Sequence, residues 1–328
     1  MVNDLGLHAR LALGELFLTE AAVVERMRHE FKIPPDEHLV YGAAIYDEHG
    51  RDALRQIYDG YVEVARRFAL PLLLASSTRR SNPERIAASR FGSREVIEDW
   101  MSLLREVRGG YRGDLFVGGL LGTRGDAYRP QEALSRRESL AFHLAQCHAF
   151  LEAGADLVMA VTLPALSEAS GLAEAMSETG LPFIISFVVD GGGLLLDGTP
   201  LCSAIATIDD ISPPLCYMVN CVHPVNLLAG LSSDANRGRA SLSRLKGIQA
   251  NASTLSPGEL DGRVDLQCDG ADSLVQGVLA LRQEYGLQIF GGCCGTDATH
   301  LEQIAGGLSD ATRAPGTATA AGERALWA

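Results

Sequence analysis

Eight short apolar runs recur along the chain, and longer amphipathic stretches separate them. After the second run, successive starts lie between 26 and 43 residues apart. Near-continuous apolar runs are typical of strands that are covered on both faces. We therefore expect eight buried strands, at 16–19, 71–76, 114–119, 156–161, 182–189, 215–220, 247–252 and 287–292.

Helix patterns occupy the stretches between these runs. Apolar residues recur at helical spacing in 94–108, and the pattern in 139–154 ends at Gly154, where a C-cap glycine belongs. Eight strand–helix units in a row favour an α/β fold of the (β/α)8 TIM-barrel type over an open doubly wound sheet. We predict one barrel domain over 1–305, with an insertion between the first two strands. Residues 306–328 are rich in Ala, Gly and Thr, which predicts a mobile tail or a contact between subunits of a homo-oligomer.

Charge and hydropathy exclude several classes of function. The formal net charge of −13 argues against nucleic acid and anionic membranes as partners, because phosphate binding needs clustered Lys and Arg. No apolar run approaches the roughly 18 residues that span a bilayer, and the N-terminus shows no secretion signal. Seven scattered cysteines fit a reducing compartment better than a disulfide scaffold, so we expect a cytoplasmic protein.

Three cysteines follow strands that should end on the same face. Cys293 and Cys294 come directly after the eighth run, and Cys221 comes directly after the sixth. In a TIM barrel the active site forms at the C-terminal ends of the strands, so the three thiols can converge there. Three thiolates with one open position are typical of a catalytic zinc site, and a thiol bound at the open position is deprotonated. The pattern indicates alkylation of sulfur. The alternative is a redox-active or inert vicinal pair at 293–294.

The other cysteines have a simpler interpretation. We expect small apolar fillers at Cys147, Cys202, Cys216 and Cys268, with Cys216 a weak candidate for a fourth metal ligand.

The segments GGCCGT (291–296), THLEQIA (299–305) and NCVHP (220–224) together resemble the homocysteine S-methyltransferase family. The resemblance extends to FLTEAAVVERM at the first strand, FLEAGADLVMAVTLPALSEA around the fourth and GIQANAS at the seventh. It implies a zinc ion held by Cys221, Cys293 and Cys294, with the sulfur of homocysteine as the fourth ligand. The implied reaction transfers a methyl group to this thiolate and gives methionine.

Two segments depart from the family pattern. Glu20, Ala21 and Ala22 stand where the family has an aspartate followed by glycines. Val161 stands where the family has an acidic residue near the amino group of the substrate. A desolvated ammonium group needs a carboxylate or carbonyl partner, so these changes concern the acceptor more than the zinc.

The remaining candidates for substrate binding lie at strand ends on the predicted active face. They are Glu20, Asn220, Asn251 and Asp126, with Tyr128 and His223 as further loop candidates. The small-molecule partners that we expect are homocysteine and a sulfonium or ammonium donor of the S-methylmethionine, S-adenosylmethionine or betaine type. Alternatives are another thiol acceptor, a corrinoid protein as donor, or a non-catalytic zinc or redox-sensing protein on the same fold.

Overall fold

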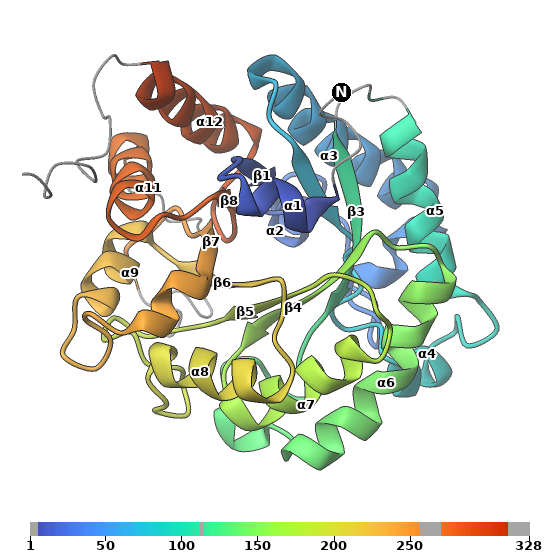
Figure 1. Cartoon of the computed structure of the whole chain (residues 1–328). Helices are drawn as coiled ribbons and strands as arrows, with labels where there is room; N and C mark the ends of the chain where they lie inside the picture. Colours follow the sequence, from blue (N-terminus) through green and yellow to red (C-terminus); the bar gives the residue numbers. More distant parts are fainter. Residues whose placement is uncertain (1–5, 110, 112–113, 256–269, 314–328) are drawn as a thin grey trace, which may run out of the picture.

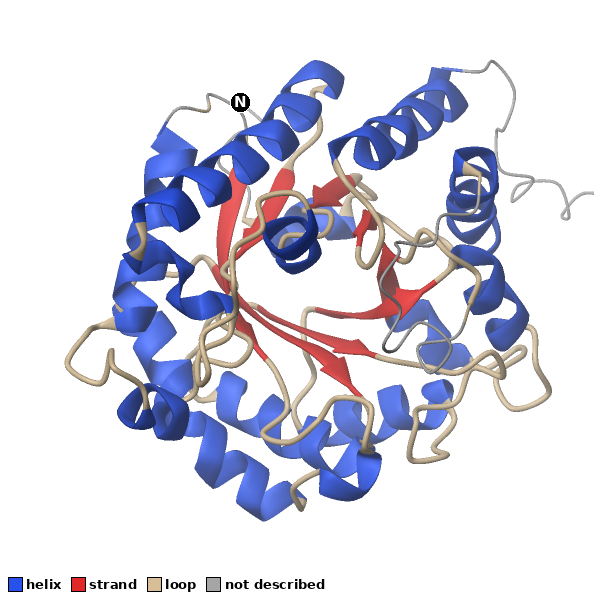
Figure 2. Cartoon of the chain, turned by 180° about the vertical axis from the view of Figure 1, so that it is seen from behind, coloured by secondary structure: helices blue, strands red, loops and turns tan. Residues whose placement is uncertain are grey.

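Eight parallel strands close into one barrel in sequence order, with helices on the outside (Figures 1 and 2). This computed structural model describes residues 6–109, 111, 114–255 and 270–313. The barrel closes where β1 pairs with β8, through Leu18 beside Phe290. The strands are β1 Phe17–Thr19, β2 Leu72–Ala75, β3 Leu115–Leu121, β4 Leu157–Leu163, β5 Phe183–Phe187, β6 Cys216–Val222, β7 Leu245–Ala250 and β8 Ile289–Gly292. The predicted TIM barrel is confirmed, and each predicted run contains or overlaps one strand.

Helix α1 precedes β1, and the other helices lie between or after the strands and cover the barrel. They are α1 Leu7–Ala12, α2 Val24–His29, α3 Glu48–Phe68, α4 Pro83–Ala88, α5 Val96–Gly109, α6 Arg136–Glu152, α7 Leu166–Ser177, α8 Leu201–Ile211, α9 Pro224–Leu231, α11 Ala271–Tyr285 and α12 Ala298–Arg313. Short 3-10 helices are η1 Tyr41–Tyr46, η2 Pro130–Glu132 and η3 Ala240–Arg244. The predicted insertion between β1 and β2 contains α2 and η1 ahead of α3.

Local sequence signals set the limits of α6. The helix begins with a capping box, in which Ser135 and Glu138 each accept a backbone N–H of the other. It is followed by Gly154, whose φ of +69° is the left-handed conformation that glycine adopts at low cost. This predicted helix end is therefore confirmed.

The end of the predicted domain falls inside a helix. Residue 305 lies within α12, which continues to Arg313 and keeps Leu308 buried. Residues 314–328 of the predicted tail lie outside the described residues, so the division into a domain and a tail stays a prediction.

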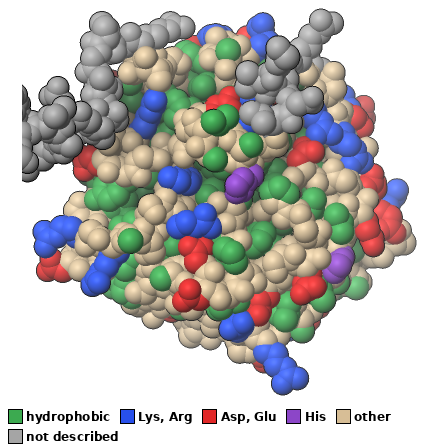
Figure 3. Space-filling view, viewed as in Figure 1, with side chains coloured by type: hydrophobic (Ala, Val, Ile, Leu, Met, Phe, Trp, Pro, Cys, Tyr) green, Lys and Arg blue, Asp and Glu red, His purple; other side chains and the backbone are tan. Residues whose placement is uncertain are grey.

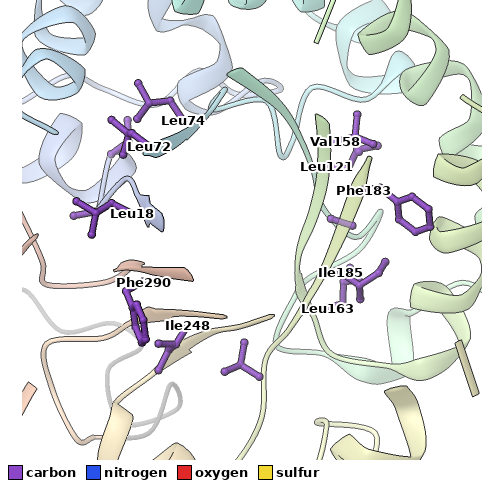
Figure 4. Close-up of a cluster of buried hydrophobic side chains, with 14 of the residues drawn as sticks. Leu18, Leu72, Leu74, Leu121, Val158, Leu163, Phe183, Ile185, Ile248 and Phe290 are labelled. Carbon is purple, nitrogen blue, oxygen red and sulfur yellow. The ribbon is translucent and has the colours of Figure 1, made fainter. Parts of the chain in front are cut away.

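Side chains of alternate residues in each strand pack into two separate apolar layers. Outward side chains such as Leu72, Phe183 and Phe290 project toward the helices and form the larger layer (Figure 4). Inward side chains such as Phe17 and Met159 fill the barrel itself. This is the two-sided burial that the apolar runs predict.

Helix α1 covers one opening of the barrel (Figure 1). Its Leu7 and Leu11 join the inward layer, and the Gln288 side chain, just before β8, donates to the Leu11 carbonyl at 2.8 Å. These contacts lie where the strands begin, so α1 closes the N-terminal end of the barrel.

The surface bears charges of both signs. Among the described side chains on the face seen in Figure 3, basic groups lie between acidic and apolar ones rather than in one continuous patch. Within the described residues, no helix has the length and apolar character that crossing a membrane requires.

Candidate metal centre

Three thiols meet at the C-terminal mouth of the barrel. The Cys221 Sγ lies 3.0 Å from the Cys293 Sγ, which lies 4.0 Å from the Cys294 Sγ, and all three sulfurs fall within 4.8 Å of one another. Three sulfurs bound tetrahedrally to zinc at about 2.3 Å would be separated by about 3.8 Å, so this spacing fits the ion. We call these three residues the cysteine cluster. Among the described residues it is the one such group with metal-ligating potential.

A break in the strand pairing aims Cys221 into the mouth. The register between β6 and β7 shifts between Asn220 and Val222, as in a β-bulge. Cys221 has a φ of +57°, a left-handed conformation that is costly for a residue with a side chain. Such strain persists at functional sites when the surrounding structure holds it in place.

Asn220 provides that restraint. Its amide group donates to the Cys221 Sγ at 3.1 Å and to the Thr162 hydroxyl at 2.8 Å. Its carbonyl oxygen accepts from the Thr162 backbone N–H at 3.0 Å and from the Ser186 hydroxyl at 2.7 Å. Thr162 itself has a φ of +58° at an irregularity in β4. Asn220 therefore ties two strained strand ends, β4 and β6, to one sulfur.

The turn after β8 is fixed through its backbone. The Cys293 N–H donates to the Ala250 carbonyl at 2.7 Å, and the Cys294 N–H donates to the Asn251 side chain at 3.2 Å. These bonds hold both thiols beside the end of β7. Asn251, a predicted substrate residue, thus lies next to the cluster and orients it.

Glycine and a carboxylate complete this turn. A side chain at Gly292 would collide with Thr296, whose hydroxyl donates to the Cys293 carbonyl at 2.7 Å. The Gly295 N–H, at a residue with a φ of +77°, donates to Glu25 of α2 at 2.5 Å. The glycines that flank the cysteines are needed because the backbone turns sharply and packs closely here.

The three thiols differ in acidity without a metal. Hydrogen bonds from Cys293 and Cys294 hold the pKa of Cys221 well below its usual value. The bond to Cys221 raises the pKa of Cys293, and the bonds to Cys221 and Cys293 raise the pKa of Cys294. The reduced cluster therefore favours one thiolate stabilised by two thiols, and a divalent cation would replace the remaining two protons.

Tyr128 approaches the cluster from the loop after β3. Its phenol also lowers the pKa of Cys221, and 45% of the Tyr128 surface is exposed to solvent. The negative charge of Cys221 raises the pKa of the phenol, so the phenol stays protonated. Asp126 lies on the same loop and accepts the Tyr128 backbone N–H at 2.9 Å. Its exposed carboxylate shapes the loop in this structure.

Glu20 follows β1 and is buried. Its two carboxylate oxygens accept from the Ala75 N–H at 3.1 Å and from the Gln249 amide at 3.4 Å. Burial raises the pKa of this carboxyl to about 7. Val161 lies in the inward apolar layer, as does Ala75, whose backbone N–H donates to Glu20.

The other predicted positions have structural contacts. His223 caps α9 by accepting the Val225 N–H at 3.3 Å, and Cys147, Cys202 and Cys216 are buried as expected. Cys268 lies outside the described residues. Sequence reasoning missed Thr162, Ser186 and Glu25, which contact the cluster or its supports; as isolated polar residues in apolar or helical stretches, they gave no signal.

Known proteins resemble this chain over most of its length. A family model described as homocysteine S-methyltransferase matches residues 20–308. The homocysteine S-methyltransferase YbgG of Bacillus subtilis is 26% identical, in a match that covers 55% of this chain and 56% of YbgG. The homocysteine S-methyltransferase of Escherichia coli is 32% identical, in a match that covers 42% of this chain and 49% of that protein. The matches thus span about half the length of these curated relatives. The metallated form of the homocysteine methyltransferase MmuM of Escherichia coli has the same fold, with a TM-score of 0.68, 23% identity, and coverage of 91% of this chain and 99% of its own.

Proposed function

Because this chain belongs to the homocysteine S-methyltransferase family, we propose that it transfers a methyl group from a small sulfonium or ammonium donor to the thiol of homocysteine. The observation that carries the proposal is the convergence of Cys221, Cys293 and Cys294 within 4.8 Å at the mouth of the barrel. Three protein thiols leave one of the four zinc positions for a substrate, as in a catalytic site, whereas a structural site fills all four with protein ligands.

The cysteine cluster would hold the zinc, and the surrounding residues would keep its sulfurs aimed at one point. Zinc bound there keeps a substrate thiol deprotonated near neutral pH and, with three thiolate ligands, leaves its sulfur electron-rich. Asn220 restrains Cys221, and Asn251 restrains the turn that contains Cys294. Supports of this kind typically change metal affinity or activity by about 10–100-fold when they are removed.

The proposed methyl transfer requires little proton transfer by the protein. In an in-line displacement, a new S–CH3 bond forms as the bond between the methyl carbon and the donor heteroatom breaks. The bonding electron pair leaves with the donor, which becomes neutral, so no acid is needed for the leaving group. Catalysis then depends on holding sulfur and methyl carbon in line, which well-oriented sites achieve by proximity.

Glu20 is the acidic group that we assign to the ammonium of homocysteine. It is the buried carboxylate at the mouth end of β1, and its pKa of about 7 places its ionisation near neutral pH. A bound ammonium would favour the charged form of Glu20.

A second acceptor class is favoured by one observation. Val161 is apolar and buried in the inward layer, so β4 offers no carboxylate to an amino group. A thiol without a free amino group would leave no ammonium unpaired there. The same zinc-thiolate chemistry would then act on a different acceptor.

Product analysis tests the proposal. Reduced, zinc-loaded protein is incubated with homocysteine and, in turn, with S-methylmethionine, S-adenosylmethionine or betaine. We expect methionine to form with at least one donor and to be absent with the Cys294→Ala variant. Turnover of thiols that lack the amino group, without turnover of homocysteine, would favour the second acceptor class. Failure of every thiol and donor would overturn the proposed methyl transfer.

A further inference from the structure

One polar side chain of β7 reaches across β8 to the end of β1 inside the barrel. This residue is Gln249, whose neighbours Ile248 and Ala250 pack in the outward layer, so its own side chain points inward. Gly291 of β8 is its partner in the strand register. A Cβ at Gly291 would lie 1.9 Å from the Thr19 hydroxyl. The missing side chain therefore leaves room for a contact between β7 and β1.

The amide nitrogen of Gln249 holds two groups at the end of β1. Its Nε2 donates to the Thr19 hydroxyl at 3.1 Å and to Glu20 Oε1 at 3.4 Å. An ionised carboxylate only accepts hydrogen bonds, so the nitrogen of the amide, and not its oxygen, must face Glu20. The carboxylate is thus held through one oxygen by Gln249 and through the other by the Ala75 N–H.

The carbonyl oxygen of the same amide remains available as an acceptor. Within the described residues, both side-chain hydrogen bonds of Gln249 come from Nε2. Gln249 is 8% exposed, and its Oε1 is not one of the fully buried described atoms that lack a partner, so a ligand can reach this oxygen. The two polar atoms of an amide share one carbon, which places Oε1 close to Glu20. A primary ammonium group, with a positive charge and three N–H donors, fits these two neighbouring acceptors.

We propose that Gln249 is a specificity-determining residue that binds the ammonium group of the acceptor together with Glu20. One N–H of the ammonium goes to the Glu20 carboxylate and a second to Gln249 Oε1. The neutral amide on β7 thus supplies a second acceptor to an ammonium that finds none at Val161 of β4. This inference rests on the proposed function, because it takes homocysteine as the acceptor.

Binding of two thiols, measured by calorimetry, tests the role of Gln249. Homocysteine and 4-mercaptobutyrate differ only in the amino group, and each is titrated into reduced, zinc-loaded protein at pH 8 without a methyl donor. This pH lies above the pKa of about 7 to which burial raises Glu20. Gln249→Met keeps the length of the side chain and removes both polar atoms. We expect the dissociation constant of homocysteine to rise about tenfold, the effect of losing one hydrogen bond to a charged group, and that of 4-mercaptobutyrate to change by less than about twofold.

A second variant keeps an acceptor at this position. In Gln249→Glu the donor to Glu20 is lost, but two carboxyl groups that share a proton still offer acceptor oxygens and a negative charge to an ammonium. Homocysteine should bind to this variant at least as tightly as to the parent. If Gln249 served only to hold Glu20 and Thr19 in place, homocysteine binding would be weaker in both variants.

The matched control is a buried glutamine at the other end of the barrel. Gln288 is 9% exposed and donates to the Leu11 carbonyl at the end that α1 closes. Gln288→Met should leave the dissociation constants of both thiols unchanged.

The possible results separate the role of Gln249 from the proposed function. Unchanged homocysteine binding in folded Gln249→Met, equal weakening of both thiols, or weaker homocysteine binding in Gln249→Glu than in the parent would each overturn the role of Gln249 alone. A parent protein that binds 4-mercaptobutyrate but not homocysteine would overturn both this role and homocysteine as the acceptor. The expected binding pattern without any formation of methionine would support the role of Gln249 and overturn the proposed methyl transfer.

Discussion

Replacing any one of Cys221, Cys293 and Cys294 by alanine is expected to remove most of the zinc from a protein that otherwise carries about one zinc per chain when reduced. Two thiolates bind the ion much less strongly than three, and the variant leaves a cavity where the sulfur was. Methyl transfer should fall by more than about a hundredfold, since even the loss of residues that only support a metal ligand costs about 10–100-fold. Metal analysis after desalting and the methionine assay measure the two effects.

The control for this prediction is a cysteine outside the cluster. Cys216 lies in the same strand as Cys221 but packs in the inward layer, so Cys216→Ala should keep its zinc. The thermal unfolding of the cluster variants should stay cooperative, because a barrel of this size has its own core. If the triple replacement holds zinc as well as the parent does, the metal site lies elsewhere; collapse of the metal-free form would indicate a structural ion.

The second large effect concerns Glu20. Glu20→Gln keeps the shape of the side chain and removes its charge, so the ammonium of homocysteine loses its partner. A charge-assisted hydrogen bond contributes roughly 1.5–3 kcal/mol, which corresponds to a rise in the apparent homocysteine constant of about ten- to a hundredfold. Zinc content should not change. Steady-state kinetics at pH 8 with varied homocysteine measure the effect.

The raised pKa of Glu20 predicts how protein stability and the effect of Glu20→Gln change with pH. Burial raises the pKa of Glu20 from 4.5 to about 7, so the folded protein binds more protons here than the unfolded chain between these values. The stability contribution of Glu20 is therefore fully present below 4.5 and is lost as pH rises to about 7, a change of about 3 kcal/mol. Glu20→Gln should lack this loss in urea unfolding. Its effect on homocysteine should be large above pH 7 and disappear below, where Glu20 is protonated.

Val161→Glu distinguishes the two acceptor classes. This variant restores an acid to β4, in the interior that Ala75 also lines. If homocysteine is the acceptor, the variant should bind it more tightly than the parent does. If the parent binds no homocysteine at millimolar concentration and Val161→Glu creates that binding, homocysteine is excluded as the native acceptor, and a thiol without a free amino group takes its place.

The sequence was sufficient to predict the barrel and the meeting of the thiols. Buried parallel strands need apolar residues on both faces, so each strand appears in the sequence as a short apolar run. Once the strands are placed, the ends of β6 and β8 must lie on one face, and Cys221 and Cys293 follow from that topology. Long-range packing did not have to be known for this step.

The restraints around the cluster could not be predicted in the same way. The left-handed conformations at Thr162 and Cys221 arise where the strand register shifts, and neither residue is a glycine that would signal a turn. Glu168 accepts the backbone N–H groups of Arg124 and Leu134, which lie 44 and 34 residues away, and every residue type except proline provides such a group. Tertiary contacts of this kind leave no pattern in a single sequence.

X-ray absorption at the zinc edge tests the central claim most directly, because it counts the sulfur atoms around the ion. The reduced, zinc-loaded protein is measured alone and with millimolar homocysteine. The account predicts three sulfur ligands in the first sample, at about 2.3 Å, and four in the second. An unchanged count with homocysteine, or a zinc ion that keeps three sulfurs after Cys221, Cys293 and Cys294 have all been replaced by alanine, would contradict it.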